Sequence, residues 1–105
     1  MSPPRTTPAL DNAIHAPVRL QIMAALAVLA ENSPGYDFND LKRLTGATDG
    51  NLGAHLTTLE AAGYVAITKT FQNKRPKTTA KATADGCKAY AAHVAALRAI
   101  IDGKT

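Results

Sequence analysis

The feature that most constrains this chain is the segment beginning at Thr48, where a helix start, a helix stop and a strand start follow in close succession. Thr48 is a good N-cap, and Gly63 is a residue at which helices commonly end. Between them three leucines recur at helical spacing, so one stripe of the segment should be buried: Leu52, Leu56 and Leu59. The segment predicts a helix over about 48–62 that passes directly into a strand. An ordinary amphipathic helix leading into a hairpin would show the same pattern, so this segment alone does not identify the fold, and the flanking segments must be considered with it.

A second short helix is predicted just before this one. Asp37 and Asp40 have the spacing of an acidic capping box, and Gly46 marks the helix end. The expected buried face consists of Phe38, Leu41 and Leu44. Two short helices joined by a tight turn that contains glycine form a helix-turn-helix.

The N-terminal part predicts a loose arm over residues 1–7, followed by one domain over residues 8–105. A short helix should begin near Pro8, with Leu10 and Ile14 on one face. Pro17 ends that helix and suits the first turn of another, which runs to about residue 30. The apolar face of this next helix is wide enough to contact both the domain core and another subunit.

A basic hairpin is predicted after Gly63. Residues 64–71 and 77–82 alternate like strands, and residues 72–76 form a polar tip. The formal net charge is +4, and the region from Lys69 to Lys88 holds six basic residues and one acid. This charge favours an anionic partner, although a solvated hairpin would have a similar composition.

The last helix should begin after Thr83 and carry an apolar seam. Its members follow at spacings of 3, 4, 3 and 4: Cys87, Tyr90, Val94, Leu97 and Ile101. At this position we expect Cys87 to be a buried packing residue rather than a redox sensor. The seam could pack on the first helix of the same chain or on a second copy.

Alanine supplies 21 of the 105 residues, and alanine buries little area. A small domain with few large side chains gains from a partner subunit, which favours a two-fold homodimer. The expected interface comes from the terminal helices: Leu10, Ile14, Tyr90, Val94, Leu97 and Ile101.

The order helix, helix, turn, helix, hairpin, helix resembles that of small bacterial and archaeal winged helix-turn-helix transcriptional regulators related to the MarR and ArsR families. The motifs that carry the resemblance are HAPVRLQI at 15–22, FNDLKRLTG at 38–46, TDGNLGAHL at 48–56, LEAAGYV at 59–65, RPKTT at 75–79 and TADG at 83–86. The resemblance implies a mostly helical α+β winged helix-turn-helix fold with a β-hairpin wing and a C-terminal dimerisation helix. It also implies a homodimer that places each recognition helix (about 48–62) in a major groove of operator DNA, usually to repress transcription.

The candidate DNA contacts lie on the side of the recognition helix opposite the leucines and on the wing (about 69–81). Asn51 can hydrogen-bond adenine, and threonines can meet bases, a thymine methyl or phosphate. This helix carries no Lys or Arg, whereas related proteins often have a basic or serine residue near Gly53 and Ala54. His55 is equally compatible with a groove contact and with a half-buried structural role. The full set is Thr48, Asn51, Ala54, His55, Thr57, Thr58, Lys69, Asn73, Lys74, Arg75 and Lys77.

Other classes of function have little support in the sequence. His15, His55 and His93 share no metal-ligand spacing, and Cys87 is the only cysteine, so no metal site, cofactor or enzymatic activity is expected. Without a membrane-spanning run or a hydrophobic signal segment, a cytoplasmic protein is expected. No effector pocket can be named, although a small-molecule effector is compatible with the resemblance. Two alternatives to a sequence-specific regulator stay open, namely a winged helix that docks a protein and a nonspecific architectural DNA binder.

Overall fold

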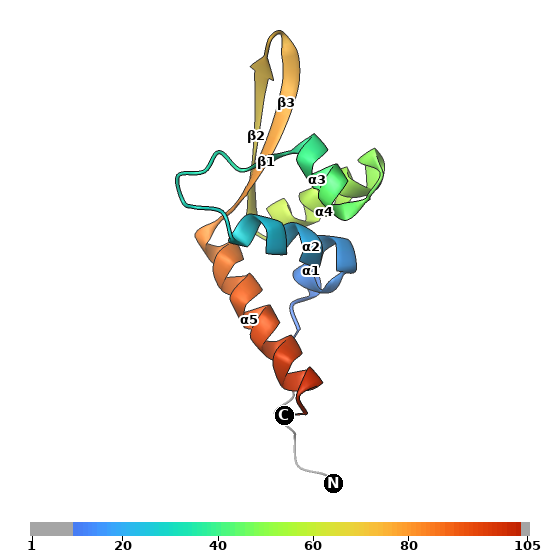
Figure 1. Cartoon of the computed structure of the whole chain (residues 1–105), viewed down its shortest axis with the longest axis vertical. Helices are drawn as coiled ribbons and strands as arrows, with labels where there is room; N and C mark the ends of the chain where they lie inside the picture. Colours follow the sequence, from blue (N-terminus) through green and yellow to red (C-terminus); the bar gives the residue numbers. More distant parts are fainter. Residues whose placement is uncertain (1–9, 104–105) are drawn as a thin grey trace.

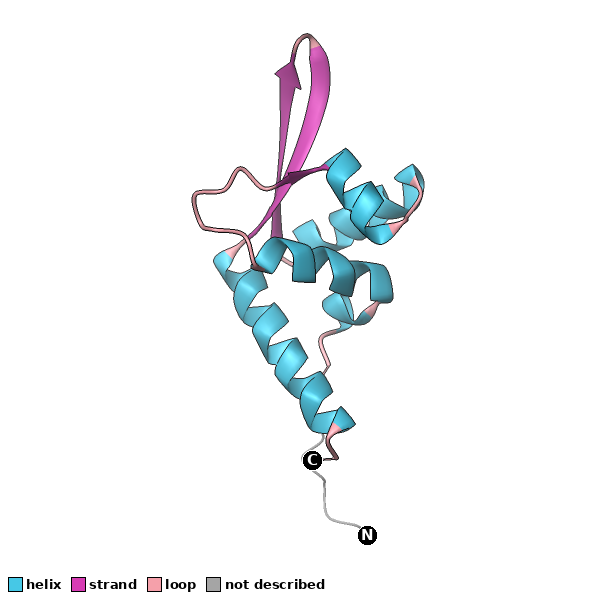
Figure 2. Cartoon of the chain, in the orientation of Figure 1, coloured by secondary structure: helices cyan, strands magenta, loops and turns pink. Residues whose placement is uncertain are grey.

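The computed structural model describes residues 10–103, which form five helices and a three-stranded sheet (Figures 1 and 2). The elements are α1 (Asn12–His15), α2 (Pro17–Ala27), β1 (Tyr36–Asp37), α3 (Phe38–Thr45), α4 (Asp49–Ala61), β2 (Val65–Gln72), β3 (Arg75–Ala82) and α5 (Ala84–Ile101). This is the mostly helical α+β order expected from the sequence, and that prediction is confirmed. The predicted arm, residues 1–7, lies outside the described residues.

The helix ends follow the predicted capping chemistry. The Thr48 hydroxyl accepts a hydrogen bond of 3.2 Å from the backbone N–H of Asn51, and so caps α4. Asp37 and Asp40 form the reciprocal capping box of α3. Gly46 ends α3 with a left-handed φ of 70°, which costs glycine little.

The first helix differs from the prediction. It begins at Asn12 rather than near Pro8, because the Asp11 carboxylate accepts the Ala13 N–H at 2.9 Å and caps it there. Leu10 therefore precedes the helix. The second helix ends at Ala27, three residues before the predicted end.

The sheet contains a strand that the sequence did not reveal. Tyr36 and Asp37 form β1, which pairs antiparallel with β3 opposite Ala80 and Thr79, so the strand order is β1-β3-β2. The long β2–β3 hairpin, called the wing below, extends beyond β1 and away from the helices (Figure 1). Its outer part is therefore a two-stranded ribbon.

The turn at the wing tip contains two residues, Asn73 and Lys74, with φ angles of 53° and 64°. Positive φ at both central positions is the geometry of a type I′ turn, whose twist matches the flanking strands. Pro76 lies one pair beyond the turn, opposite Phe71. In this register its nitrogen points away from β2, and β1 does not reach that far, so the missing N–H removes no ladder bond.

The core joins the helices to the base of the sheet. Its fully buried side chains come from α1, α2, α3 and α4, with Val65 and Ala80 added from the sheet. The three leucines of α4 are all buried, as predicted. The predicted inward position of Leu44 is wrong, because its side chain is 55% exposed and only Leu41 of α3 is fully buried. An eight-residue helix on the outside of the core buries a narrow stripe, and Leu44 lies beyond that stripe.

α5 packs on its own chain chiefly through small residues, and of the predicted seam Tyr90 also packs against the core. Gly86, His93 and Ala96 are its buried residues, and α5 contacts α1, α2 and β3. Gly86 permits this approach, since a Cβ added there would lie 2.0 Å from the Tyr64 carbonyl oxygen. The prediction that Cys87 is buried is wrong, because its thiol side chain is exposed. Among the described residues no helix is long and apolar enough to cross a membrane.

Candidate nucleic-acid interface

The outer face of α4 is exposed and nearly free of charge. Because the leucine stripe faces the core, the predicted contacts Thr48, Asn51, Ala54, Thr57 and Thr58 are all solvent-exposed. Asp49 and Glu60, near the two ends, are the charged residues of the helix. A helix face of this kind can enter a groove closely but attracts a polyanion poorly.

The two threonines use their hydroxyl protons within the helix. The Thr57 hydroxyl donates to the Gly53 carbonyl at 3.0 Å, and the Thr58 hydroxyl donates to the Ala54 carbonyl at 3.1 Å. In this state their oxygens can accept hydrogen bonds and their methyl groups can make apolar contacts. Thymine methyl groups and base N–H donors therefore suit this surface better than base acceptors do.

The glycines of α4 have no packing reason to be glycine. A Cβ added at Gly50 or Gly53 would meet nothing within 4 Å, and neither residue has a positive φ. Each glycine weakens the helix by roughly 1 kcal/mol relative to alanine. Open space above both positions would allow a bound molecule to approach the α4 backbone closely.

His55 is half-buried and is held by Arg19, which was not predicted to belong to the site. The Arg19 guanidinium lies 3.1 Å from His55 Nδ1, and its other nitrogens donate to the carbonyls of Ala13 and Asn12. Since a guanidinium can only donate, Nδ1 accepts and the neutral ring carries its proton on Nε2. Arg19 thus orients His55 and ties α1 and α2 to the recognition helix.

The cations of α3 already have acidic partners. Lys42 lies 2.5 Å from the Asp49 carboxylate, and Arg43 pairs with Asp40 one turn earlier. These pairs are largely exposed and so contribute little to stability. They do reduce the positive charge that the helix-turn-helix itself offers.

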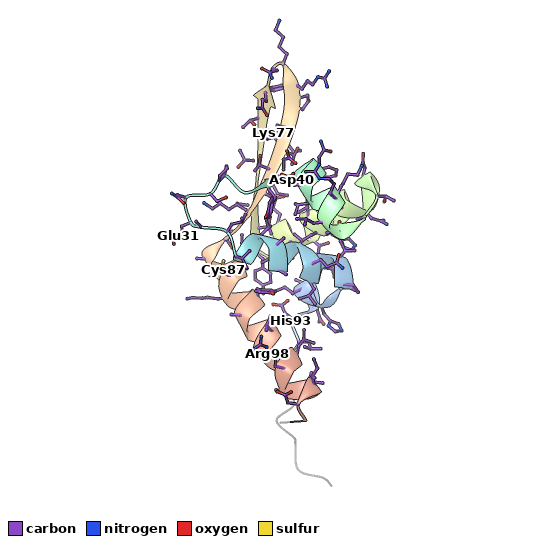
Figure 3. All side chains as sticks on the ribbon, in the orientation of Figure 1. Glu31, Asp40, Lys77, Cys87, His93 and Arg98 are labelled. Atoms are coloured by element: carbon purple, nitrogen blue, oxygen red, sulfur yellow. The ribbon has the colours of Figure 1, made fainter. Side chains whose placement is uncertain are left out.

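The wing carries the positive charge of the site. Lys69, Asn73, Lys74 and Arg75 are exposed, and Lys77 is half-exposed. Within residues 10–103, none of the four cations lies within 4.0 Å of a carboxylate. Figure 3 shows Lys77 on the wing, far from His93 and Arg98 on α5.

One acid modifies the charge at the wing base. The hydrogen bond from the Asp40 backbone N–H lowers the pKa of the Asp37 carboxyl, and the nearby Lys77 lowers it further. Asp37 is therefore ionised at neutral pH. It offsets part of the Lys77 charge and leaves the outer wing as the most basic part.

A groove of about 530 Å³ separates α4 from the wing. Its walls come from α3, α4, β2 and β3: Phe38, Gly53, Leu56, Thr57, Glu60, Ile67, Lys69 and Thr78. The groove thus brings one predicted helix contact, Thr57, together with one predicted wing contact, Lys69. The other wing cations, Lys74, Arg75 and Lys77, lie outside this groove.

The predicted dimer residues divide into two groups. Ile14 is fully buried in its own chain, so it cannot line a surface for a partner, and its assignment to the interface is corrected. Leu10, Tyr90, Val94 and Leu97 are half-buried, and Ile101 is 78% exposed. The exposed Ile100 adjoins them on α5.

A polar cluster where α5 meets the start of α1 was not predicted. His93 is 1% exposed, and its Nδ1 accepts the Asp11 N–H. The Asp11 carboxylate also accepts the Tyr64 hydroxyl at 2.6 Å, which raises the pKa of Tyr64. Burial lowers the pKa of His93, and the charge of nearby His15 lowers it further. The only sequence signal was that His93 shares a helical spacing with three small residues, Gly86, Ala89 and Ala96.

Comparisons with known proteins agree with this geometry. A family model described as a winged helix DNA-binding domain matches residues 18–101. An uncharacterized protein of Methanocaldococcus jannaschii is 40% identical over 73 residues, which cover 70% of this chain and 75% of that protein. The solved structure of a transcriptional regulator homologue from Pyrococcus horikoshii is similar with a TM-score of 0.75 and 31% identity, covering 87% of this chain and 86% of that one.

Proposed function

Because the chain belongs to the winged helix DNA-binding domain family, we propose that it is a sequence-specific transcriptional repressor that binds operator DNA as a homodimer. In this proposal α4 enters the major groove and the wing holds the flanking backbone. The observation that carries this proposal is that the positive charge of the site lies on the wing and not on α4. The exposed face of α4 is nearly free of charge, whereas Lys69, Lys74, Arg75 and Lys77 of the wing beside it have no carboxylate within 4.0 Å among the described residues.

The charge distribution assigns affinity and specificity to different elements. Phosphate contacts dominate the affinity of protein–DNA complexes, and base contacts specify the sequence. The wing cations fit the first role, while Asn51, the Thr57 and Thr58 methyl groups and His55 Nε2 fit the second. Gly50 and Gly53 would let the α4 backbone approach the groove.

The homodimer is supported by the apolar surface left on α5. Val94 and Leu97 are half-buried within one chain, and Ile100 and Ile101 are exposed beside them. A two-fold axis through this surface would pair two α5 helices and present two recognition helices to a pseudopalindromic operator. A relationship to the MarR and ArsR families, a cytoplasmic location and the lack of catalytic activity belong to the same proposal.

The test is a selection of bound duplexes from a pool of random sequences. The selected sequence is then compared with a scrambled duplex by fluorescence anisotropy at equal salt. The proposal expects two related half-sites about one helical turn apart, with the selected duplex bound at least about a hundredfold more tightly than the scrambled one. Binding of both duplexes with equal affinity would instead indicate an architectural DNA binder. No binding at low salt would favour a protein-docking role.

A further inference from the structure

The outer end of the wing carries an apolar pair that the fold does not use. Phe71 is 78% exposed, and the residue opposite it on β3 is Pro76, which is also exposed. The inner apolar pairs on the same strands, Val65 with Ala82 and Ile67 with Ala80, are covered by the helices. No described part of the chain covers Phe71.

Strand alternation places Phe71 on the face of the wing that looks towards α4. Side chains two residues apart point to the same side of a strand, so Phe71 shares a face with Ile67 and Lys69. Both of those residues line the groove between α4 and the wing. Phe71 lies two residue pairs farther out than Lys69, or about 7 Å along the strand.

The groove between α4 and the wing has the position of a DNA backbone strand. In the proposed complex α4 lies in the major groove of the DNA. The DNA strand that borders the major groove then passes through the protein groove between α4 and the wing. Lys69, which lines the groove, is then placed to meet a phosphate. A side chain beyond that strand on the same face of the wing reaches the neighbouring minor groove.

The charges around Phe71 indicate what would cover it. Lys69 and Lys74 lie two and three residues away along the chain, and Arg75 adjoins Pro76. Lys74 also holds a positive φ at a turn position where glycine is favoured, a conformation that disfavours side chains. Cations on either side of an exposed aromatic ring suit a polyanion that has apolar surfaces between its charges. DNA is such a polyanion, because sugars and base edges lie between its phosphates.

We propose that Phe71, supported by Pro76, is an apolar wedge that enters the minor groove beside the operator half-site, opens a base-pair step and bends the duplex. A β-ribbon is wider than the unperturbed minor groove of about 6 Å, so entry of the wing end widens that groove. Apolar side chains that enter a base-pair step from the minor groove bend DNA towards the major groove. This inference rests on the proposed function and adds to it a residue that selects deformable steps, such as TA or CA, outside the α4 contacts.

The experiment measures bending and affinity on the duplex selected above. Energy transfer between dyes at the two ends of the duplex reports the bend, and anisotropy reports Kd. Phe71→Ala should lose most of the bend and bind about tenfold more weakly, whereas Phe71→Leu should keep most of both because leucine also serves as a wedge. The matched control is Thr70→Ala, an exposed neighbour on the opposite face, which should behave as wild type. Since no charge changes, the dependence of Kd on salt should be the same in all three variants.

The outcomes separate the wedge from the proposed function. If the wild-type protein binds the selected duplex without bending it, or if Phe71→Ala bends it fully and binds within twofold, the wedge is wrong and DNA binding stands. The same result would follow if Phe71 docked a protein. If the wild-type protein binds no duplex at low salt, the proposed function fails and the wedge fails with it. Circular dichroism of each variant verifies folding, which an exposed side chain should not affect.

Discussion

His93 Nδ1 accepts a hydrogen bond of 3.0 Å from the backbone N–H of Asp11, 82 positions earlier in the chain. The bond joins α5 to the start of α1 and requires an unprotonated Nδ1. The neutral ring therefore carries its proton on Nε2, which has no hydrogen-bond partner within the described residues. Protonation would break the bond to Asp11 and place a charge in a buried site.

This arrangement predicts a protein that loses stability in mild acid. The folded-state pKa of His93 lies below the ordinary value of about 6.5, chiefly because of burial. As pH falls through the ordinary value of about 6.5, the histidine of the unfolded chain takes up a proton before His93 of the folded chain does. The free energy of unfolding therefore decreases. Urea unfolding followed by circular dichroism between neutral pH and pH of about 5 measures this slope.

His93→Asn is the variant that tests the cause of the slope, because its side-chain oxygen can replace Nδ1 as acceptor and does not titrate. It should flatten the decline between neutral and mildly acidic pH, whereas His15→Asn at an exposed position should retain most of it. Equal slopes in wild type and His93→Asn would show that another group is responsible.

Gly86→Ala should be destabilising although alanine is the better helix former. The new Cβ would lie 2.0 Å from the Tyr64 carbonyl oxygen, and neither backbone can move without disturbing the β2–α5 junction. Overpacking of this kind costs about 1–3 kcal/mol. The matched control is Gly50→Ala, in open space, which should raise the free energy of unfolding by up to about 1 kcal/mol. Thermal denaturation compares the two, and a Gly86→Ala protein as stable as wild type would contradict the close contact.

Lys74→Gly should stabilise the wing while weakening DNA binding. Glycine accepts the positive φ of this turn position, so the type I′ turn should gain about 1 kcal/mol. Loss of a cation at the wing tip should at the same time weaken binding to every sequence. Thermal melting and anisotropy of the same preparation measure both effects. A variant that binds DNA as tightly as wild type would exclude the wing tip from the interface.

Leu97→Asp should convert the proposed homodimer to a monomer. The substitution places a charge in the α5 surface that continues through Ile100 and Ile101, where a two-fold partner would bury it. Because Leu97 is only half-buried in one chain, the monomer should stay folded. Light scattering reports the mass, and Arg98→Asp at the neighbouring exposed position is the control. A dimer that persists in Leu97→Asp would place the interface elsewhere.

Local chemistry made most of the fold predictable. Thr48, Asp37, Gly46 and Thr83 mark helix ends through their own side chains or backbone preferences, and the structure places those ends as predicted. β1 was missed because it contains two residues and exists only through its pairing with β3. A strand that short has no periodicity to detect.

The face with which α5 packs on its own chain could not be predicted, for a different physical reason. The larger apolar residues predict a seam from Cys87 to Ile101, which stays a prediction for a partner subunit, whereas the positions buried within the chain include Gly86 and Ala96, where small side chains permit close contact. His93 is buried there with one ring nitrogen, Nδ1, bonded to the backbone N–H of Asp11, and that partner lies too far along the chain to be inferred.

The site itself was partly predictable. Exposure of Asn51, Thr57 and Thr58 followed from the leucine stripe. The Arg19–His55 contact and the pairing of the α3 cations depend on side-chain positions that one-dimensional spacing does not fix.

Whether the wing holds the DNA backbone is tested by the salt dependence of binding to the selected duplex, measured for the wild-type protein and for Lys74→Ala combined with Arg75→Ala. Anisotropy titrations between about 50 and 200 mM salt give the slope of log K against log salt, which changes by about 0.9 for each phosphate contact. If the wing holds the backbone, the double variant should bind all sequences more weakly and show a slope shallower by about two to four units in a dimer. An unchanged slope and affinity would show that the wing does not hold the DNA.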